Sequence, residues 1–147
     1  MPLATDAAYE GDFYTWAQQQ GALLRTGRLD EIDRDNIAEE IESLAREEFR
    51  KLVGFYGAIM LLMLKWEHQP NLRSGALACK IEIQRIYVQH LLQDSPGLSS
   101  RMQDALDRAY RTARLEALVE AGFRKSTFPE VCPYTLDDLL ERPFPVE

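Results

Sequence analysis

Five residues of this chain could together bind an anion or a small ligand: Trp16, Glu40, Lys65, Trp66 and Arg85. Helical periodicity places Trp66 in the apolar seam of a long helix, with Lys65 beside it. Arg85 falls beside an apolar face of the next helix, where a charge needs a partner. Glu40 is the natural partner, so the sequence predicts either a ligand pocket around these residues or a structural Glu40–Arg85 ion pair at the rim of the core.

Paired carboxylates for acid–base catalysis are the next chemistry to consider, because that chemistry uses two acids in different environments. The segment around Glu40 also holds Glu39 and Glu42. At helical spacing Glu40 lies about 65° from the centre of the apolar stripe, whereas Glu39 and Glu42 lie well round toward solvent. Glu40 alone could reach a shielded groove, and a glutamate paired with an arginine is the simpler interpretation.

Metal and nucleophile sites are not indicated by the histidines and cysteines. A di-iron bundle would show Glu-x-x-His on two helices, and neither copy occurs. Cys79 and His90 share a helix face, but they lie about 16 Å apart along it, too far to form a dyad within one helix. Cys132 is far from Cys79 in sequence, and two reduced thiols are expected. We therefore assign no catalytic residue and expect no metal and no cofactor.

Length and composition indicate one helical domain over residues 1–147, with a loose N-terminus at 1–8 and an irregular C-terminal segment at 123–147 that holds a short helix. No apolar run approaches the roughly 20 residues that a membrane helix needs. The net charge of −7 disfavours nucleic-acid binding, although Arg101, Arg108 and Arg111 share one helix face. The start of the chain shows no secretory signal, so a cytoplasmic location is expected.

Cap signals divide the chain into about four main helices and a short last one, an all-α bundle. Asp12 is the expected N-cap of the first helix, which Gly27 would end. A long helix, continuous or kinked near Gly54 and Gly57, follows a cap at Asp33 or at Asn36, and Pro70 ends it. The remaining helices are expected at about 74–93, from 96 to 122, and from a Thr135 cap with Asp138 through 141.

The third predicted helix is apolar on two sides and must be covered on both. Its first face is composed of Leu77, Ile81, Val88, Leu91 and Leu92. The opposite face is composed of Ala76, Cys79, Ile83, Ile86 and His90. This second face is the candidate interface, since a helix of this kind is either central in a bundle or half buried by a second subunit.

Several sequence fragments, spread over about residues 9–145, resemble a bacterial family known as domain-of-unknown-function family twenty-nine. The fragments are 12–16 (DFYTW), 39–42 (EEIE), 64–66 (LKW) followed by Pro70, 94–96 (DSP), and Phe128-Pro129 with 132–134 (CPY). The resemblance implies an all-helical fold without naming a reaction. The chain departs from many relatives at Leu62, Leu77 and Lys80, so a function of the histidine that relatives carry at the position of Leu62 would not extend to this chain.

Two functions of different classes follow from these observations. The leading hypothesis is a non-catalytic, cytoplasmic helical protein that binds itself, as a dimer, or another protein through the candidate interface. The alternative is an enzyme or small-ligand binder with its pocket around Glu40, Lys65, Trp66 and Arg85.

Overall fold

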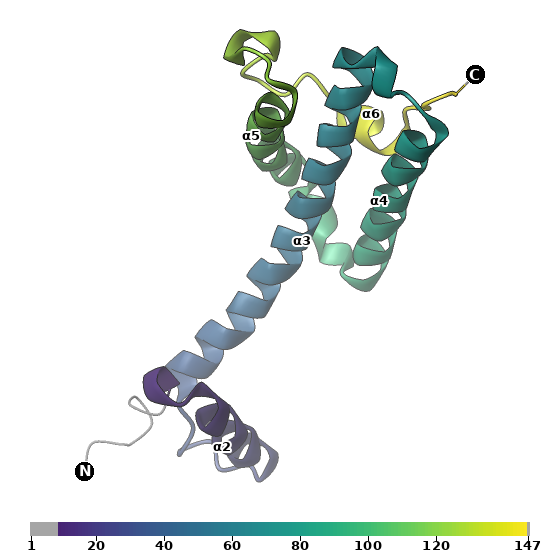
Figure 1. The fold of residues 1–147 in the computed structure, drawn as a ribbon. Coiled ribbons are helices and arrows are strands. Elements are labelled where there is room, and N and C mark those ends of the chain that lie inside the picture. Colours follow the sequence, from purple (N-terminus) through teal and green to yellow (C-terminus); the bar gives the residue numbers. More distant parts are fainter. Residues whose placement is uncertain (1–8, 147) are drawn as a thin grey trace. The chain divides into compact units, whose positions relative to one another are not determined.

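The computed structural model describes residues 9–146, which contain helices and no strand (Figure 1). The all-α prediction is confirmed. The α-helices are α2 (Phe13–Arg25), α3 (Arg34–His68), α4 (Gly75–Asp94), α5 (Met102–Ala121) and α6 (Leu136–Glu141), with short 3₁₀ helices at Pro70–Leu72 (η1), Pro96–Arg101 (η2) and Lys125–Thr127 (η3). The expected loose N-terminus, residues 1–8, lies outside the described residues.

Several of the predicted helix ends are confirmed by their capping contacts. The Asp12 carboxylate accepts a hydrogen bond from the Thr15 backbone N–H, and Thr135 with Asp138 forms a complete capping box at the start of α6. Gly122 ends α5 in the left-handed conformation, at φ 69°.

The second helix begins directly after Asp33, the earlier of its two predicted caps. The alternative cap at Asn36 is wrong, because α3 starts at Arg34, directly after Asp33. Asn36 lies in the first turn and its side-chain amide donates to the Asp33 carboxylate. From there α3 is one continuous helix of 35 residues through Gly54 and Gly57 to His68.

The chain divides into two compact units, the first up to Arg46 and the second from Glu47 onward. Helix α3 contributes its first part to one unit and the rest to the other. The expectation of one folding domain over residues 1–147 stays a prediction. Measuring the unfolding of each unit separately would test it.

In the first unit, α2 and the start of α3 bury few side chains. Trp16 and Gln20 of α2 are buried. The apolar stripe predicted for α3 includes Ile41 and Leu44, but these two side chains are 61% and 69% exposed. The first part of the stripe is therefore not buried. The buried residues of α3 start at Phe49, in the second unit, where the packing helices are.

The second unit has a continuous apolar core between α3, α4, α5 and α6. From α3 it contains Leu52, Tyr56, Ile59, Met60 and Met63; from α4, Ile81, Val88 and Leu91; from α5, Leu106, Ala109, Tyr110, Ala113 and Ala117; and from the C-terminal segment, Phe128, Tyr134 and Leu139. The small alanines let α5 approach its neighbours closely. Helix α4 gives its first predicted face to this core.

Candidate functional site

The two candidate pocket residues of the first unit are bonded to residues of that unit. The indole N–H of Trp16 donates to the Asp33 carboxylate at 3.0 Å, and the Tyr9 hydroxyl donates to Glu40 at 2.6 Å. The hydrogen bond to Glu40 raises the pKa of the Tyr9 hydroxyl above its ordinary value. Trp16 and Glu40 therefore serve to join the N-terminal segment and α2 to the start of α3.

Lys65 and Trp66 also have close partners, both in the second unit. The Lys65 ammonium lies 2.5 Å from the Glu120 carboxylate of α5. The Trp66 ring meets Phe144 edge-on, with ring centres 5.3 Å apart, and the Arg73 guanidinium lies 5.7 Å from its centre. The depression beside Lys65 has a volume of about 10 Å³, room for about one water molecule. It is too small for a substrate.

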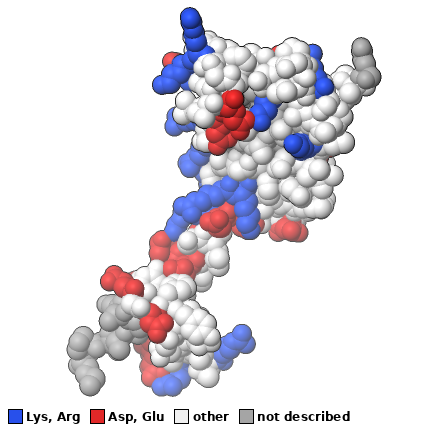
Figure 2. Space-filling view, in the orientation of Figure 1, with Lys and Arg blue, Asp and Glu red and all other residues white. Residues whose placement is uncertain are grey.

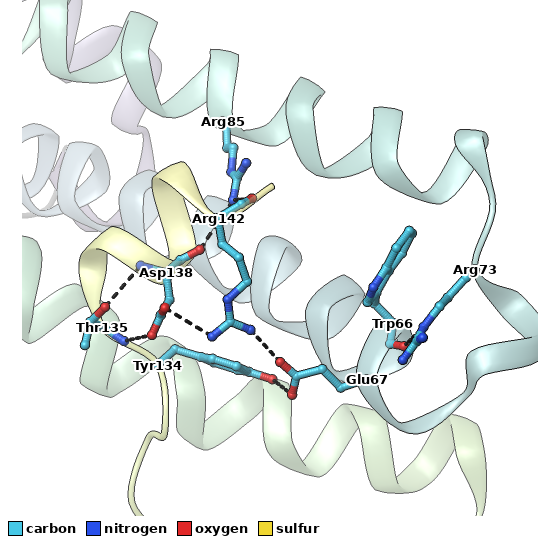
Figure 3. A network of polar contacts seen from close by, with 8 residues as sticks. All are labelled: Trp66, Glu67, Arg73, Arg85, Tyr134, Thr135, Asp138 and Arg142. Carbon is cyan, nitrogen blue, oxygen red and sulfur yellow. Dashed lines mark hydrogen bonds and ion pairs between the residues drawn. The ribbon is translucent and has the colours of Figure 1, made fainter. Parts of the chain in front are cut away.

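Arg85 is buried and binds the C-terminal end of α6 (Figure 3). Its guanidinium donates to the backbone carbonyls of Leu139 at 2.9 Å, Arg142 at 2.8 Å and Asp138 at 3.3 Å. The last carbonyls of a helix lack partners within the helix and carry partial negative charge. A guanidinium, with five donors in one plane, satisfies several of them at once.

The carboxylate that pairs with Arg85 is Glu82, one turn before it on α4, at 2.8 Å. Glu40, the partner predicted from the sequence, accepts a hydrogen bond from the Tyr9 hydroxyl in the first unit, and a Glu40–Arg85 pair stays a prediction. Sequence periodicity placed Arg85 correctly beside the apolar face of α4. The carbonyls of α6, which take most of its donors, belong to a segment some 50 residues further along the chain.

A second group of polar contacts fastens α6 to the end of α3. The Tyr134 hydroxyl donates to one oxygen of Glu67 at 2.9 Å, and Arg142 donates to the other at 2.6 Å (Figure 3). Arg142 also reaches the Asp138 carboxylate at 3.1 Å. With Arg85, these residues form what we call the α6 network.

Two groups of the α6 network, Tyr134 and Asp138, have pKa values shifted from their ordinary values. Burial, reinforced by the hydrogen bond to Glu67, raises the pKa of the Tyr134 hydroxyl far above its ordinary value. The backbone N–H of Thr135 lowers the pKa of the Asp138 carboxyl, and Arg142 adds to the effect. Every charged member is held by another protein group, so the network is an anchor for α6.

One sequence signal indicates the α6 network. A helix of six residues is too short to be stable by itself, so a capping box at Thr135 implies tertiary anchors for the helix that it starts. An arginine on an apolar face elsewhere in the chain is a natural anchor, because it can bind several terminal carbonyls. Glu67 and Arg142 carry no comparable sequence signal.

The candidate interface lies on the surface of the second unit. Ile83 and Ile86 are each 44% exposed, and Ala76, Cys79 and His90 are exposed as well. In the view of Figure 2 the surface over α4 is largely uncharged. The first face of α4 is in the core, so one of its two apolar faces is covered and the other is free in the single chain.

Three further features bear on metal, membrane and nucleic-acid binding. No group of three or more potential metal ligands is found among residues 9–146. In the same range, no helix is long and apolar enough to cross a membrane. Arg101 and Arg108 both pair with Asp104 and lie over the Phe49 ring at 4.1 and 5.2 Å, so part of their charge is used within the unit.

Fold and contacts define a helical protein in which the polar candidate residues mainly join one helix to another. The chain belongs to the family described as Domain of unknown function DUF29, whose model matches residues 8–145. The resemblance seen in the sequence fragments is thereby confirmed. No curated protein and no solved structure gives a match.

Proposed function

We propose that this protein is a non-catalytic helical interaction protein of the bacterial cytoplasm that binds a second copy of itself through the candidate interface on α4. One observation carries the proposal: α4 is apolar on two sides and the core covers only one. Ile83 and Ile86, at the middle of the other side, remain 44% exposed.

The energetic argument rests on the area that a partner would cover. Burying apolar surface contributes roughly 25 cal/mol per Å², so an exposed pair of isoleucines on a rigid helix is a ready source of binding energy. Single exposed apolar residues are common on any protein surface, but a face that repeats over several helical turns is typical of a contact site.

The non-catalytic part of the proposal is supported by the partners of the candidate pocket residues. Arg85 donates its hydrogen bonds to α6 and Glu82, and Lys65 is paired with Glu120. For the alternative function, an enzyme or small-ligand binder, these side chains would have to exchange such partners for a ligand. The cytoplasmic part is supported by Cys79 and Cys132, which are both free thiols, as is usual in a reducing compartment.

Light scattering coupled to size exclusion tests the proposal directly. We expect the wild-type protein to have the mass of a dimer at micromolar concentration and Ile83→Glu to be a monomer with unchanged helicity. Leu115→Glu is the matched control, because Leu115 is 47% exposed on α5 and undergoes the same change in size and charge. A monomeric wild type, or a dimer that survives Ile83→Glu, would overturn the proposal.

A further inference from the structure

The exposed face of α4 has the spacing of a coiled-coil seam. Its members, Ala76, Cys79, Ile83, Ile86 and His90, follow one another at steps of three, four, three and four residues, and Gln93 continues the series. This is the a and d pattern of a heptad repeat, which presents a straight stripe to one partner helix. All six positions are exposed in the single chain.

We propose that α4 pairs antiparallel with α4 of a second copy, so that Ile83 packs on Ile86 of the partner subunit and Cys79 packs on His90 of the partner subunit. This rests on the proposed function and adds the partner element, its direction and its register. The pairing is two-fold symmetric, so each contact occurs twice.

Side-chain size supports this register. In antiparallel coiled coils an a position of one helix shares a layer with a d position of the other. The two central layers then hold isoleucine against isoleucine. In the next layers the small Cys79 faces the larger His90, and the outermost layers place the small Ala76 against Gln93. Pairing small with large side chains fills the layers evenly.

Like-charge repulsion at the flanking positions favours this register over a shifted one. The positions that flank the seam are Lys80, Glu82, Tyr87 and Gln89, all exposed. In the proposed register Glu82 faces Gln89 and Lys80 faces the Tyr87 ring, to which a cation is attracted. No like charges meet.

The neighbouring arrangements are less favourable. A shift of one heptad in one direction places Glu82 against Glu82 and Lys80 against Lys80 of the second copy. The opposite shift sets the isoleucines against His90 and Gln93. A parallel pair would stack Ala76 on Ala76 and leave that layer underfilled.

Disulfide formation distinguishes these arrangements. In a Cys132→Ser background, His90→Cys introduces a thiol that faces Cys79 of the second copy only in the proposed register. The two positions are about 16 Å apart within one helix, so a bond between them has to join two chains. Under mild oxidation we expect most of this variant to become a covalent dimer, with the bond from Cys79 to the introduced cysteine identified by peptide mass spectrometry.

Two controls separate the outcomes. The background protein with Cys79 alone should stay uncrosslinked, and adding Cys79→Ala to the His90→Cys variant should abolish the bond. A covalent dimer of the background through Cys79 would show a parallel pair and overturn the register. A dimer by light scattering without the mixed bond would overturn this inference and leave the proposed function standing, whereas a monomer would remove both.

Discussion

The two units of this protein are stabilised in different ways. The second unit packs side chains from four helices into a continuous apolar core. In the first unit, α2 buries two side chains, those of Trp16 and Gln20. In the first unit, hydrogen bonds from Trp16 to Asp33 and from Tyr9 to Glu40 hold the elements together. A typical hydrogen bond contributes about 1 kcal/mol net, much less than a large buried apolar side chain.

The comparison shows that a continuous helix can belong to two different environments. Helix α3 has the same apolar spacing along most of its length, yet Ile41 and Leu44 are exposed while Leu52 and Ile59 are fully buried. Periodicity therefore marks a side of the helix, and the elements around it decide which part of that side becomes core. We expect stability to concentrate in the second unit.

The largest effect should come from core truncation in the second unit. Ile59→Ala removes a fully buried side chain and should lower the free energy of unfolding by about 3 kcal/mol, whereas Ile41→Ala should change it by less than about 0.5 kcal/mol. Urea unfolding followed by tryptophan fluorescence measures both, with Trp16→Phe leaving Trp66 as the reporter of the second unit and Trp66→Phe leaving Trp16 for the first.

The same reporters test the single-domain prediction. We expect the Trp16 signal to change at a lower urea concentration than the Trp66 signal. Coincident transitions would show that both units unfold as one domain, and equal losses from the two alanine variants would contradict the contrast in packing.

Arg85→Ala should have the next largest effect, because it removes the guanidinium donors from the buried Leu139 carbonyl and from the Arg142 carbonyl at the end of α6. Loss of one partner from a buried charged contact costs on the order of 3 kcal/mol. Glu82→Ala removes only an exposed partner and should cost much less. Thermal and urea unfolding give both values.

Combining Arg85→Ala with Glu40→Ala sharpens the comparison of the units. Each residue binds partners of its own unit, so the two losses should add to within about 0.5 kcal/mol. A clear deviation from additivity would show that Glu40 and Arg85 are coupled and would restore the predicted ion pair.

Acid should weaken the anchoring of α6. The pKa of Asp138 is lowered in the folded protein by the Thr135 N–H, so its contribution to stability is present above the unfolded value of about 4 and is lost as pH falls through the lower folded value. Asp138→Asn should cost about 1 kcal/mol at pH 7 and flatten the dependence between pH 4 and pH 2. Identical slopes for both proteins in urea titrations at these pH values would count against the role of Asp138.

The smallest effect is expected at Tyr56. Its hydroxyl is buried with no hydrogen-bond partner among the described residues, and burial raises its pKa to about 12. Tyr56→Phe should leave stability unchanged or raise it by up to about 1 kcal/mol. Tyr110→Phe is the matched control and should be destabilising by about 1 kcal/mol, because the Tyr110 hydroxyl donates to the Pro129 carbonyl at 2.6 Å. Equal losses in thermal melts would show that Tyr56 has a partner of its own.

Local signals predicted the helices well because helix ends depend on near neighbours. Asp12, Gly122 and the Thr135–Asp138 box act within a few residues of themselves, so their types and spacing sufficed. For the long helix the pattern left two caps open, Asp33 and Asn36, and the helix starts after the earlier of the two.

By itself the sequence determined the fold class, most of the helix ends and the two apolar faces of α4, since each of these depends on spacing along a single helix. Only the tertiary structure decided the partners that lie far away in the chain. Arg85 binds the end of α6, Lys65 pairs with Glu120, and Glu40 accepts a hydrogen bond from Tyr9. In each case the partners are 31 residues or more apart in the chain. Such pairings depend on which surfaces meet in three dimensions, and helical periodicity contains no information about that.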